Sequence, residues 1–339
     1  MGTGVTAAIL AQADGRVGTG HLRESLAVAD ALIAAGGRAH LWTNAGAPSP
    51  FFTERPELRR LISLAPATLS LWAKRAAREG ARVILANLWD PAPAQVRALR
   101  AGGLPLVVMD EVGGKALAAD LIVNPLLIAS RTRYPGSRAR VLRGLAWLAL
   151  DASYARAERR PIRGPLRTLL VTFGGVDRTG ATIRAVRLLA GWRPEARKII
   201  VLGPGFAHDA ALKKTMSRFP SAGLEIVRGA KSLKALIVAS DAVLTAGGNT
   251  LCEAACLGIS ALVAHEDPHE RLQGRAFEKA GFARCLGPGR ALTGRILFPA
   301  LASLDDPARR RRRADAGRRL VDGLGAGRLA RLLEETAVC

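Results

Sequence analysis

Aromatic residues are scarce in this sequence and make up 4% of its 339 residues. The core must therefore be built mainly from Ala, Val, Leu and Ile, within an apolar share of 49% that excludes a disordered chain. Cysteines are also few: Cys252, Cys256, Cys285 and Cys339 form no CxxC pair and lie near no histidine-rich segment. Neither a disulfide scaffold nor a zinc site is indicated. We expect Cys252 and Cys256 to be buried thiols in a reducing compartment.

Long apolar runs are absent. No stretch approaches the ~20 residues that a membrane-spanning helix needs, and the run from Ile237 to Leu244 already contains Asp241. The N-terminus lacks a basic segment, and its short apolar stretch runs into Asp14, which suits a core strand better than an export signal. The sequence therefore predicts a soluble, cytoplasmic protein.

Lysine is rare too, with eight lysines among 50 basic residues, and the formal net charge is +22. The densest basic run, Arg309 to Arg319, has no aromatic residue near it that could stack on bases. We therefore expect no specific nucleic-acid partner and interpret the run as the solvated face of a helix. A weak contact of this run with an anionic membrane surface is the alternative.

Short β-branched runs alternate with longer helical stretches, which is typical of βαβ units around a parallel sheet. The sequence predicts an α/β protein with two Rossmann-like, doubly wound domains facing across a cleft. We expect an N-terminal domain at 1–158, a C-terminal domain at 159–339 and a hinge near 156–165. The predicted strands are Val5–Ala11, Arg38–Thr43, Arg82–Ala86, Leu106–Met109, Leu121–Val123, Leu169–Phe173, Ile199–Leu202, Leu224–Val227, Ala242–Leu244 and Ala261–Ala264.

The first glycine-rich loop, residues 14–23, follows the first predicted strand, where ligands of such sheets bind. Gly18 and Gly20 let the backbone approach a ligand at the start of the next helix. A dinucleotide fingerprint would need a third glycine where Arg23 stands, and the second strand ends without an acid for a ribose. We therefore expect no NAD and, in the absence of a GK[ST] sequence, no P-loop.

His21 lies beside this loop at the start of a predicted helix. A helix N-terminus disfavours the imidazolium, so a neutral histidine that accepts a proton is expected there. A capping or core histidine is the alternative interpretation.

Two more glycine loops follow strands of the second predicted domain. In the first, Gly174 and Gly175 precede Asp177. In the second, residues 245–253, the amides of Gly248, Asn249 and Thr250 would form an anion site suited to a diphosphate, and Glu253 could accept hydrogen bonds from a ribose. A plain turn with an exposed glutamate is the alternative.

Together these motifs resemble the GT-B nucleotide-sugar enzymes of the MurG type, and among them the UDP-sugar hydrolases of pseudaminic acid biosynthesis. The matching segments occur in the order of that family, and they are residues 18–23, 108–111, 119–125, 142–144, 172–177 and 246–253.

The resemblance implies a metal-independent hydrolase without a cofactor. It would release UDP and free sugar from a UDP-linked diacetamido-trideoxyhexose, feeding flagellin or surface-glycan modification. His21 would activate water for attack at the anomeric carbon with inversion. The substrate-binding residues implied are Gly18, Gly20, Arg23, Gly174, Gly175, Asp177, Gly247, Gly248, Asn249, Thr250, Glu253, His269 and Glu270.

The sequence departs from this family in three segments. Trp147 replaces a tyrosine, Asp151 replaces an arginine, and His269-Glu270 replaces an Asn-Gln pair. An amide that could donate to the sugar is thereby exchanged for an acceptor. Two alternatives therefore stay open: a glycosyltransferase that uses a UDP-sugar donor, and a non-catalytic nucleotide-sugar binding protein of flagellar glycosylation. The sequence does not indicate an oligomeric state.

Overall fold

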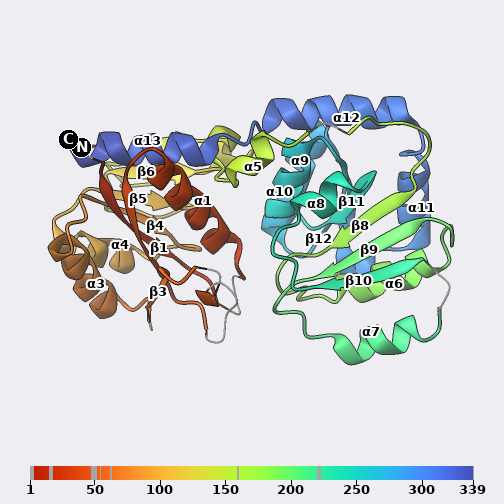
Figure 1. Ribbon diagram of the computed structural model, residues 1–339, viewed down its shortest axis with the longest axis horizontal. Helices are drawn as coiled ribbons and strands as arrows, with labels where there is room; N and C mark the ends of the chain where they lie inside the picture. Colours follow the sequence, from red (N-terminus) through yellow and green to blue (C-terminus); the bar gives the residue numbers. More distant parts are fainter. Residues whose placement is uncertain are drawn as a thin grey trace. The chain divides into compact units, whose positions relative to one another are not determined.

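The computed structural model describes residues 4–14, 18–46, 52–53, 55–61, 63–158, 160–219 and 223–338. The chain forms two compact units (Figure 1). The first comprises Met1–Ala152 together with Gly323–Cys339, and the second comprises Ser153–Asp322.

The first unit is built on a seven-stranded parallel sheet of order β3-β2-β1-β4-β5-β6-β7. Its central strands are almost entirely buried and mostly apolar, as expected for a parallel sheet covered on both faces. The strands are β1 (Thr6–Ala11), β2 (Arg38–Thr43), β3 (Arg59–Arg60), β4 (Val83–Asn87), β5 (Leu106–Met109), β6 (Leu121–Asn124) and β7 (Arg140–Arg143).

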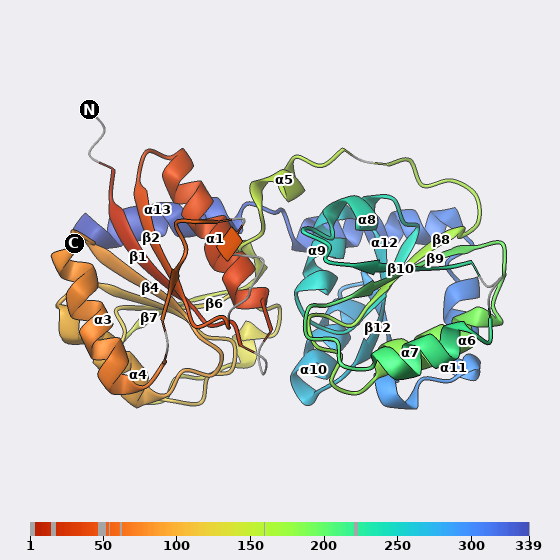
Figure 2. The ribbon, with the colours of Figure 1, turned by 60° about the horizontal axis from the view of Figure 1, so that its bottom comes forward.

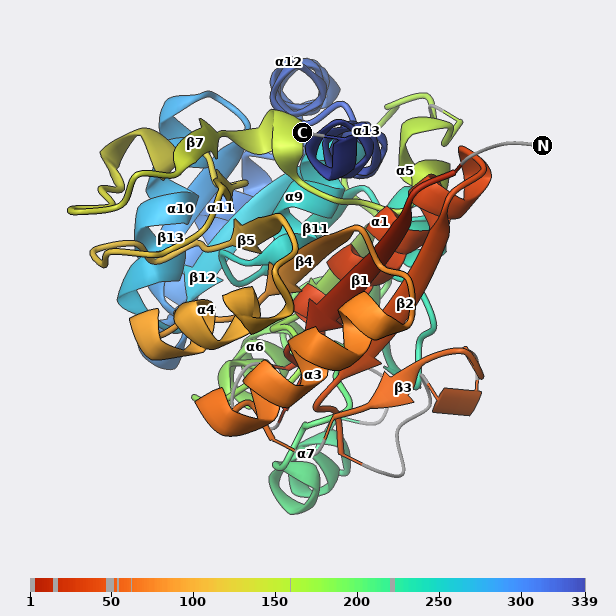
Figure 3. The same cartoon turned by 90° about the vertical axis from the view of Figure 1, so that its left-hand side faces the viewer.

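Helices cover both faces of this sheet. Side chains of α1 (Gly20–Ala34) and α13 (Gly325–Val338) share one apolar core with alternate residues of β1 and β4. Those of α3 (Pro66–Arg78) and α4 (Pro93–Leu99) share the core on the other face, which Figure 3 shows toward the viewer. Both helices begin with a proline in the first turn, where its missing N–H costs nothing.

The second unit has a six-stranded parallel sheet of order β10-β9-β8-β11-β12-β13. The strands are β8 (Thr168–Thr172), β9 (Arg197–Leu202), β10 (Leu224–Arg228), β11 (Ala242–Thr245), β12 (Ser260–His265) and β13 (Ala283–Pro288).

The helices of the second unit likewise divide between the two faces (Figure 2). Buried side chains of α6 (Ala181–Ala190), α7 (Asp209–Met216) and α11 (Gly294–Ala302) complete one core. On the remaining side, α9 packs against α8 and α12, and α10 packs against β12 and β13. These four helices are α8 (Lys234–Val238), α9 (Asn249–Leu257), α10 (Pro268–Lys279) and α12 (Pro307–Leu320).

Each sheet has one point where the chain reverses its direction of progress, and ligands of open α/β sheets bind there. In the first unit this switch lies between β1 and β4, and in the second between β8 and β11. The loops after β1 and β11 carry the two glycine motifs. The fold therefore places both motifs at switch points.

The domain boundary differs from the one expected at residue 158. Residues 323–339 leave the second unit, because Leu329 and Leu333 of α13 are fully buried in the core of the first. The expected hinge at 156–165 lies within the second unit, since the boundary falls at the short helix α5 (Ala152–Ala155).

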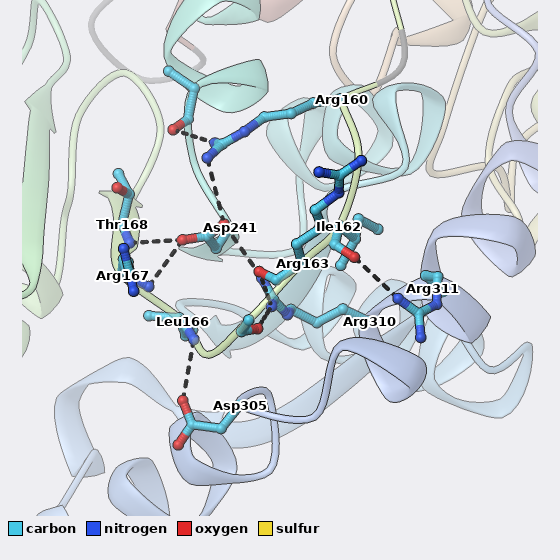
Figure 4. A network of polar contacts seen from close by, with 12 residues as sticks. Arg160, Ile162, Arg163, Leu166, Arg167, Thr168, Asp241, Asp305, Arg310 and Arg311 are labelled. Carbon is cyan, nitrogen blue, oxygen red and sulfur yellow. Dashed lines mark hydrogen bonds and ion pairs between the residues drawn. The ribbon is translucent and has the colours of Figure 1, made fainter.

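The basic run of α12 is not the wholly solvated face expected from the sequence. Arg310 is 1% exposed and forms an ion pair with Asp241, at 3.3 Å (Figure 4). Its guanidinium also donates to the carbonyl of Gly164, and Arg311 donates to the carbonyl of Ile162. Part of the run therefore anchors the segment that leads into β8.

Cys252 and Cys285 are buried free thiols, and Cys256 is half-buried. Cys339 lies outside the described residues. In the part of the chain that the structure describes, no helix combines the length and apolarity required to cross a membrane.

Candidate active site

His21 lies in the first turn of α1, directly after the glycine loop that follows β1. Gly18 has φ +78°, a conformation that glycine adopts without strain, and it leads the chain into the helix. The imidazole is 7% exposed, and its ring centre lies 6.0 Å from that of Trp89. The ring nitrogen Nδ1 is buried and has no hydrogen-bond partner among the described residues. Such an orphaned nitrogen at a switch point is the position expected for a group that meets a ligand.

The environment of His21 keeps its imidazole neutral near pH 7. Burial lowers the pKa of His21, and the negative charges of Glu24 and Asp14 offset part of that shift. A neutral imidazole can accept a proton, so His21 in this form is able to act as a general base.

Asn87, the last residue of β4, was not recognised from the sequence. Its Nδ2 atom donates to the carbonyl of His21, at 3.2 Å, and to Oε2 of Glu24, at 3.0 Å. Both Asn87 and Glu24 are almost fully buried, at 1% and 2% exposed. The asparagine therefore ties the first turn of α1 to the adjacent strand end. One signal was present in the sequence, because Asn87 directly follows a predicted strand.

Two acids follow β5 at the same edge of the sheet. Burial raises the pKa of Glu111 to about 8, with further contributions from Glu24 and Asp110. Burial also raises the pKa of Asp110, although its carboxylate accepts hydrogen bonds from the backbone N–H groups of Val112 and Gly113. Glu111 therefore carries a proton at neutral pH and can donate a hydrogen bond.

In the second unit, α9 starts at Asn249, after the glycine loop that follows β11. Gly247 is required here, because a Cβ atom would lie 2.7 Å from both Cα and Cβ of Glu270. Gly248 is exposed, and it precedes the amides of Asn249 and Thr250 at the helix start. Backbone N–H groups at a helix start bind phosphate oxygens well.

Glu270 packs directly on this glycine loop. Its Oε2 atom accepts a hydrogen bond from the backbone of Glu266, at 2.7 Å, and its Oε1 atom lies 3.8 Å from the place a Cβ of Gly248 would take. Burial raises the pKa of Glu270 to about 7, an effect that Asp267 and Glu266 reinforce. Near neutral pH this carboxyl group is therefore present in both ionised and protonated forms.

The remaining predicted residues of the second unit lie in different surroundings. The carboxylate of Asp177 accepts hydrogen bonds from the backbone N–H groups of Ala181 and Thr182, at 2.8 and 3.0 Å, in the first turn of α6. Glu253 and His269 are half-buried, and burial lowers the pKa of His269.

Contacts join the loops after β8 and β12. Arg178 forms an ion pair with Asp267, at 3.1 Å, and Thr179 donates to Glu266 from both its backbone and its hydroxyl, at 2.9 and 2.8 Å. The loop that contains Gly174 and Gly175 is thereby held to the start of α10. Because Glu270 of α10 also packs on the loop after β11, three strand ends of the second sheet are connected to each other.

The predicted residues gather at one edge of each sheet. Gly18, Gly20, His21 and the exposed Arg23 belong to the first unit, and the other predicted residues belong to the second. Residues 15–17 of the first loop lie outside the described residues. Within the described ranges, no group of three or more His, Cys, Asp or Glu side chains is arranged to hold a metal ion.

Comparison with solved structures defines the class of fold. The chain is 14% identical to MurG of Acinetobacter baumannii, with a TM-score of 0.66 over 98% of this chain and 99% of that one. For LpCGTa, solved in complex with UDP, the values are 14% and 0.65 over 99% of both chains. A glycosyltransferase of Rickettsia africae gives 13% and 0.66, also over 99% of both. The protein therefore has a GT-B-like fold.

A sequence relative is the spore coat polysaccharide biosynthesis protein SpsG of Bacillus subtilis. It is 26% identical over 237 residues, which cover 68% of this chain and 69% of SpsG. No protein-family model matches the sequence.

Proposed function

We propose that this protein cleaves the bond between the anomeric carbon and the diphosphate of a UDP-sugar, with His21 as the general base. The observation that carries the proposal is the buried imidazole at the first switch point, whose Nδ1 has no hydrogen-bond partner among the described residues. The glycine loop before α9 supports it with a group of amides suited to the diphosphate. The complex of LpCGTa with UDP, on the same fold, supports uridine nucleotides as the ligand class.

The reaction assigns each group one task. The acceptor oxygen attacks the anomeric carbon while its proton passes to His21. The carbon–oxygen bond to the diphosphate breaks, and its electron pair stays on the departing UDP. Amides at the start of α9 would stabilise the charge that develops there. His21 then returns its proton to solvent.

With water as the acceptor, the protein is a hydrolase of a UDP-linked diacetamido-trideoxyhexose, the activity that its motifs resemble. With a sugar or lipid hydroxyl as the acceptor, it is a glycosyltransferase. The comparisons support transfer to such an acceptor, because the relative SpsG is named for polysaccharide biosynthesis and a glycosyltransferase is among the solved structures of the same fold. Enzymes of polysaccharide assembly pass sugars to acceptors, so transfer is the competing hypothesis. A binding protein without turnover is the third.

One assay separates these alternatives. Purified protein is incubated with UDP-2,4-diacetamido-2,4,6-trideoxy-β-L-altropyranose, and UDP release and the anomeric configuration of the product are followed by NMR. Release with inversion in the absence of an acceptor supports hydrolysis. Release only after addition of an acceptor supports transfer. Binding of UDP by calorimetry without any turnover would leave the binding protein.

The role of His21 is tested in the same assay. His21→Ala should lower the rate about 10²- to 10⁴-fold, the usual contribution of a general base. His40→Gln is the matched control, because His40 is a half-buried histidine of the same unit, on β2 and away from the loop after β1. An undiminished rate in the His21 variant would reject the assigned base.

A further inference from the structure

The first turn of α1 contains a polar arrangement that the proposed reaction has not used. Asn87 holds two groups of this turn at once, the carbonyl of His21 and the carboxylate of Glu24. A glutamate that is 2% exposed is unusual unless its charge has a task, because burying an ionised carboxylate is costly.

The position of Glu24 relative to His21 follows from the helix. Residues three apart lie on the same face of an α-helix with their Cβ atoms ~5–6 Å from each other. Glu24 therefore stands one turn after His21 on the same face. The hydrogen bond from Asn87 limits the orientations that its carboxylate can adopt.

We propose that Glu24, held by Asn87, is the positioning residue of His21. The carboxylate stabilises the positive charge that the imidazole acquires when it removes a proton from the acceptor oxygen. No proton passes to Glu24 in this step. The inference rests on the proposed role of His21 as the base and adds the group that makes this base strong enough in a buried place.

The other charges around His21 agree with this assignment. On α1 itself the charged neighbours are Arg23 and Glu24, and the loop before α1 contributes Asp14. The segment after β5 contributes Glu111 near Glu24, and Glu111 carries a proton at neutral pH. Glu24 comes before Asp14 among the charges that raise the pKa of His21 against the effect of burial.

The experiment measures the pKa of His21 directly, by NMR titration of the protein labelled with ¹⁵N-histidine, with the resonance assigned by a His21→Gln variant. Glu24→Gln keeps the shape of the side chain and its ability to accept from Asn87. We expect it to lower the pKa of His21 by at least about half a unit, the effect of losing one charge at this distance even in a strongly screened setting. Asp30→Asn is the matched control, because it removes an exposed carboxylate nine residues further along the same helix. It should leave the pKa unchanged.

Asn87→Ala provides a second variant, which keeps the charge of Glu24 and removes the group that holds it. A smaller decrease in the pKa of His21 is expected. An unchanged pKa in Glu24→Gln would overturn the proposal. Loss of folding in both variants would also overturn it, because the pair would then serve the fold alone.

Activity distinguishes this inference from the proposed function. In the UDP-release assay, Glu24→Gln should lower kcat, leave KM nearly unchanged and move the acid limb of the pH profile to lower pH. If His21→Ala releases UDP at the normal rate while Glu24→Gln still shifts the pKa of His21, His21 is not the general base, but the electrostatic coupling between Glu24 and His21 is confirmed. If His21→Ala abolishes UDP release but Glu24→Gln leaves the pKa of His21 unchanged, the role of His21 as the base is confirmed and the proposed role of Glu24 is wrong.

Discussion

Individual ionisable residues in the two units have pKa values displaced in opposite directions. Burial lowers the pKa of His21 and raises those of Glu111, to about 8, and Glu270, to about 7. Pairs of groups displaced in this way are typical of sites that move protons near neutral pH. Each of the three follows a strand end or starts a helix there, so backbone topology determines which residues are displaced.

Glu270 should make nucleotide binding depend on pH. Its carboxyl group faces the loop proposed for the diphosphate, and it ionises as the pH rises through about 7. The added negative charge opposes a diphosphate, so affinity for a UDP-sugar should fall about three- to tenfold between pH 6 and pH 8. Isothermal titration calorimetry with UDP-N-acetylglucosamine measures this without interference, because its diphosphate does not titrate in that range.

Glu270→Gln mimics the protonated form and should bind with nearly constant affinity over the same range. Glu195→Gln, an exposed acid of the same unit, serves as the charge control and should behave like the unaltered protein. An equal pH dependence in the Glu270 variant and the unaltered protein would refute the assignment.

At the scale of single elements, α6 depends on its cap. Both carboxylate oxygens of Asp177 accept from the first turn of this helix. Asp177→Ala should lower the free energy of unfolding by about 1 kcal/mol, within the range of ~0.5–2 for lost caps, as measured by urea denaturation. Asp177→Asn should recover only part of this loss, since its single amide oxygen can accept from only one of the two N–H groups, although asparagine tolerates the φ of +50°. Lost UDP binding at unchanged stability would contradict this capping role and support the ligand-binding role predicted from the sequence.

The ion pair of α12 should be costly to break from one side. Arg310→Met leaves Asp241 with two backbone donors, from Arg167 and Thr168, and with the exposed Arg160 at 3.9 Å, but without its buried cation. We expect a loss of about 3 kcal/mol in the free energy of unfolding. Replacing both partners, as Asp241→Asn with Arg310→Met, should cost less than the two single changes added together. Arg312→Met, at an exposed position of the same helix, should change stability by less than ~0.5 kcal/mol, and a similar loss there would contradict the prediction.

Elements defined by side-chain pattern were predictable, and those defined by backbone pairing alone were not. All ten predicted strands exist, and most of them are apolar runs of buried parallel strands, although β10 has no fully buried residue. The strands that were not predicted are β3, β7 and β13. β3 is two exposed arginines, β7 begins and ends with exposed arginines, and β13 contains an arginine, a glycine and a proline. Each of these three is defined by its backbone pairing with a neighbouring strand, and the amino-acid composition of a segment does not indicate such pairing.

The candidate site was predictable to a similar degree. The glycine loops and His21 were recognised because the spacing of their residues along the sequence is itself unusual. Glu24, Asn87 and Glu111 were missed as a group, since only the fold brings residues from α1, β4 and β5 to one edge. The hydrogen bonds of Asp177 to the start of α6 were not predicted, because an acid after two glycines suits a ligand site and a helix cap equally well.

At the scale of the whole molecule, the charge of +22 should influence the approach of an anionic substrate. Salt screens such long-range attraction, with a Debye length of ~10 Å at 0.1 M. Raising sodium chloride from 50 to 500 mM should therefore increase the apparent KM for a UDP-sugar several-fold and change kcat less than about twofold. Sucrose at matched osmolarity is the control. A fall in kcat at constant KM would contradict the prediction.

The return of α13 should make the first unit depend on the C-terminus. Leu329 and Leu333 are fully buried in its core, and each contributes about 2 kcal/mol by burial. A chain ending at Asp322 should lose the cooperative melting of the first unit in differential scanning calorimetry and keep that of the second. A chain ending at Glu334, which lacks only the last turn of α13, should retain both transitions. Two intact transitions in the shorter chain would refute this dependence.

Because of α13, the two units complete their folding in the opposite order to that in which they are translated. The first unit is translated first, but α13, which covers one face of its sheet together with α1, emerges about 170 residues later, after the whole second unit. At ~5–20 residues per second, the apolar side of the nascent sheet waits roughly ten to thirty seconds for its cover. The second unit, although synthesised later, is therefore the first to finish folding. Until α13 is made, a chaperone would bind to the uncovered part of this face of the first unit.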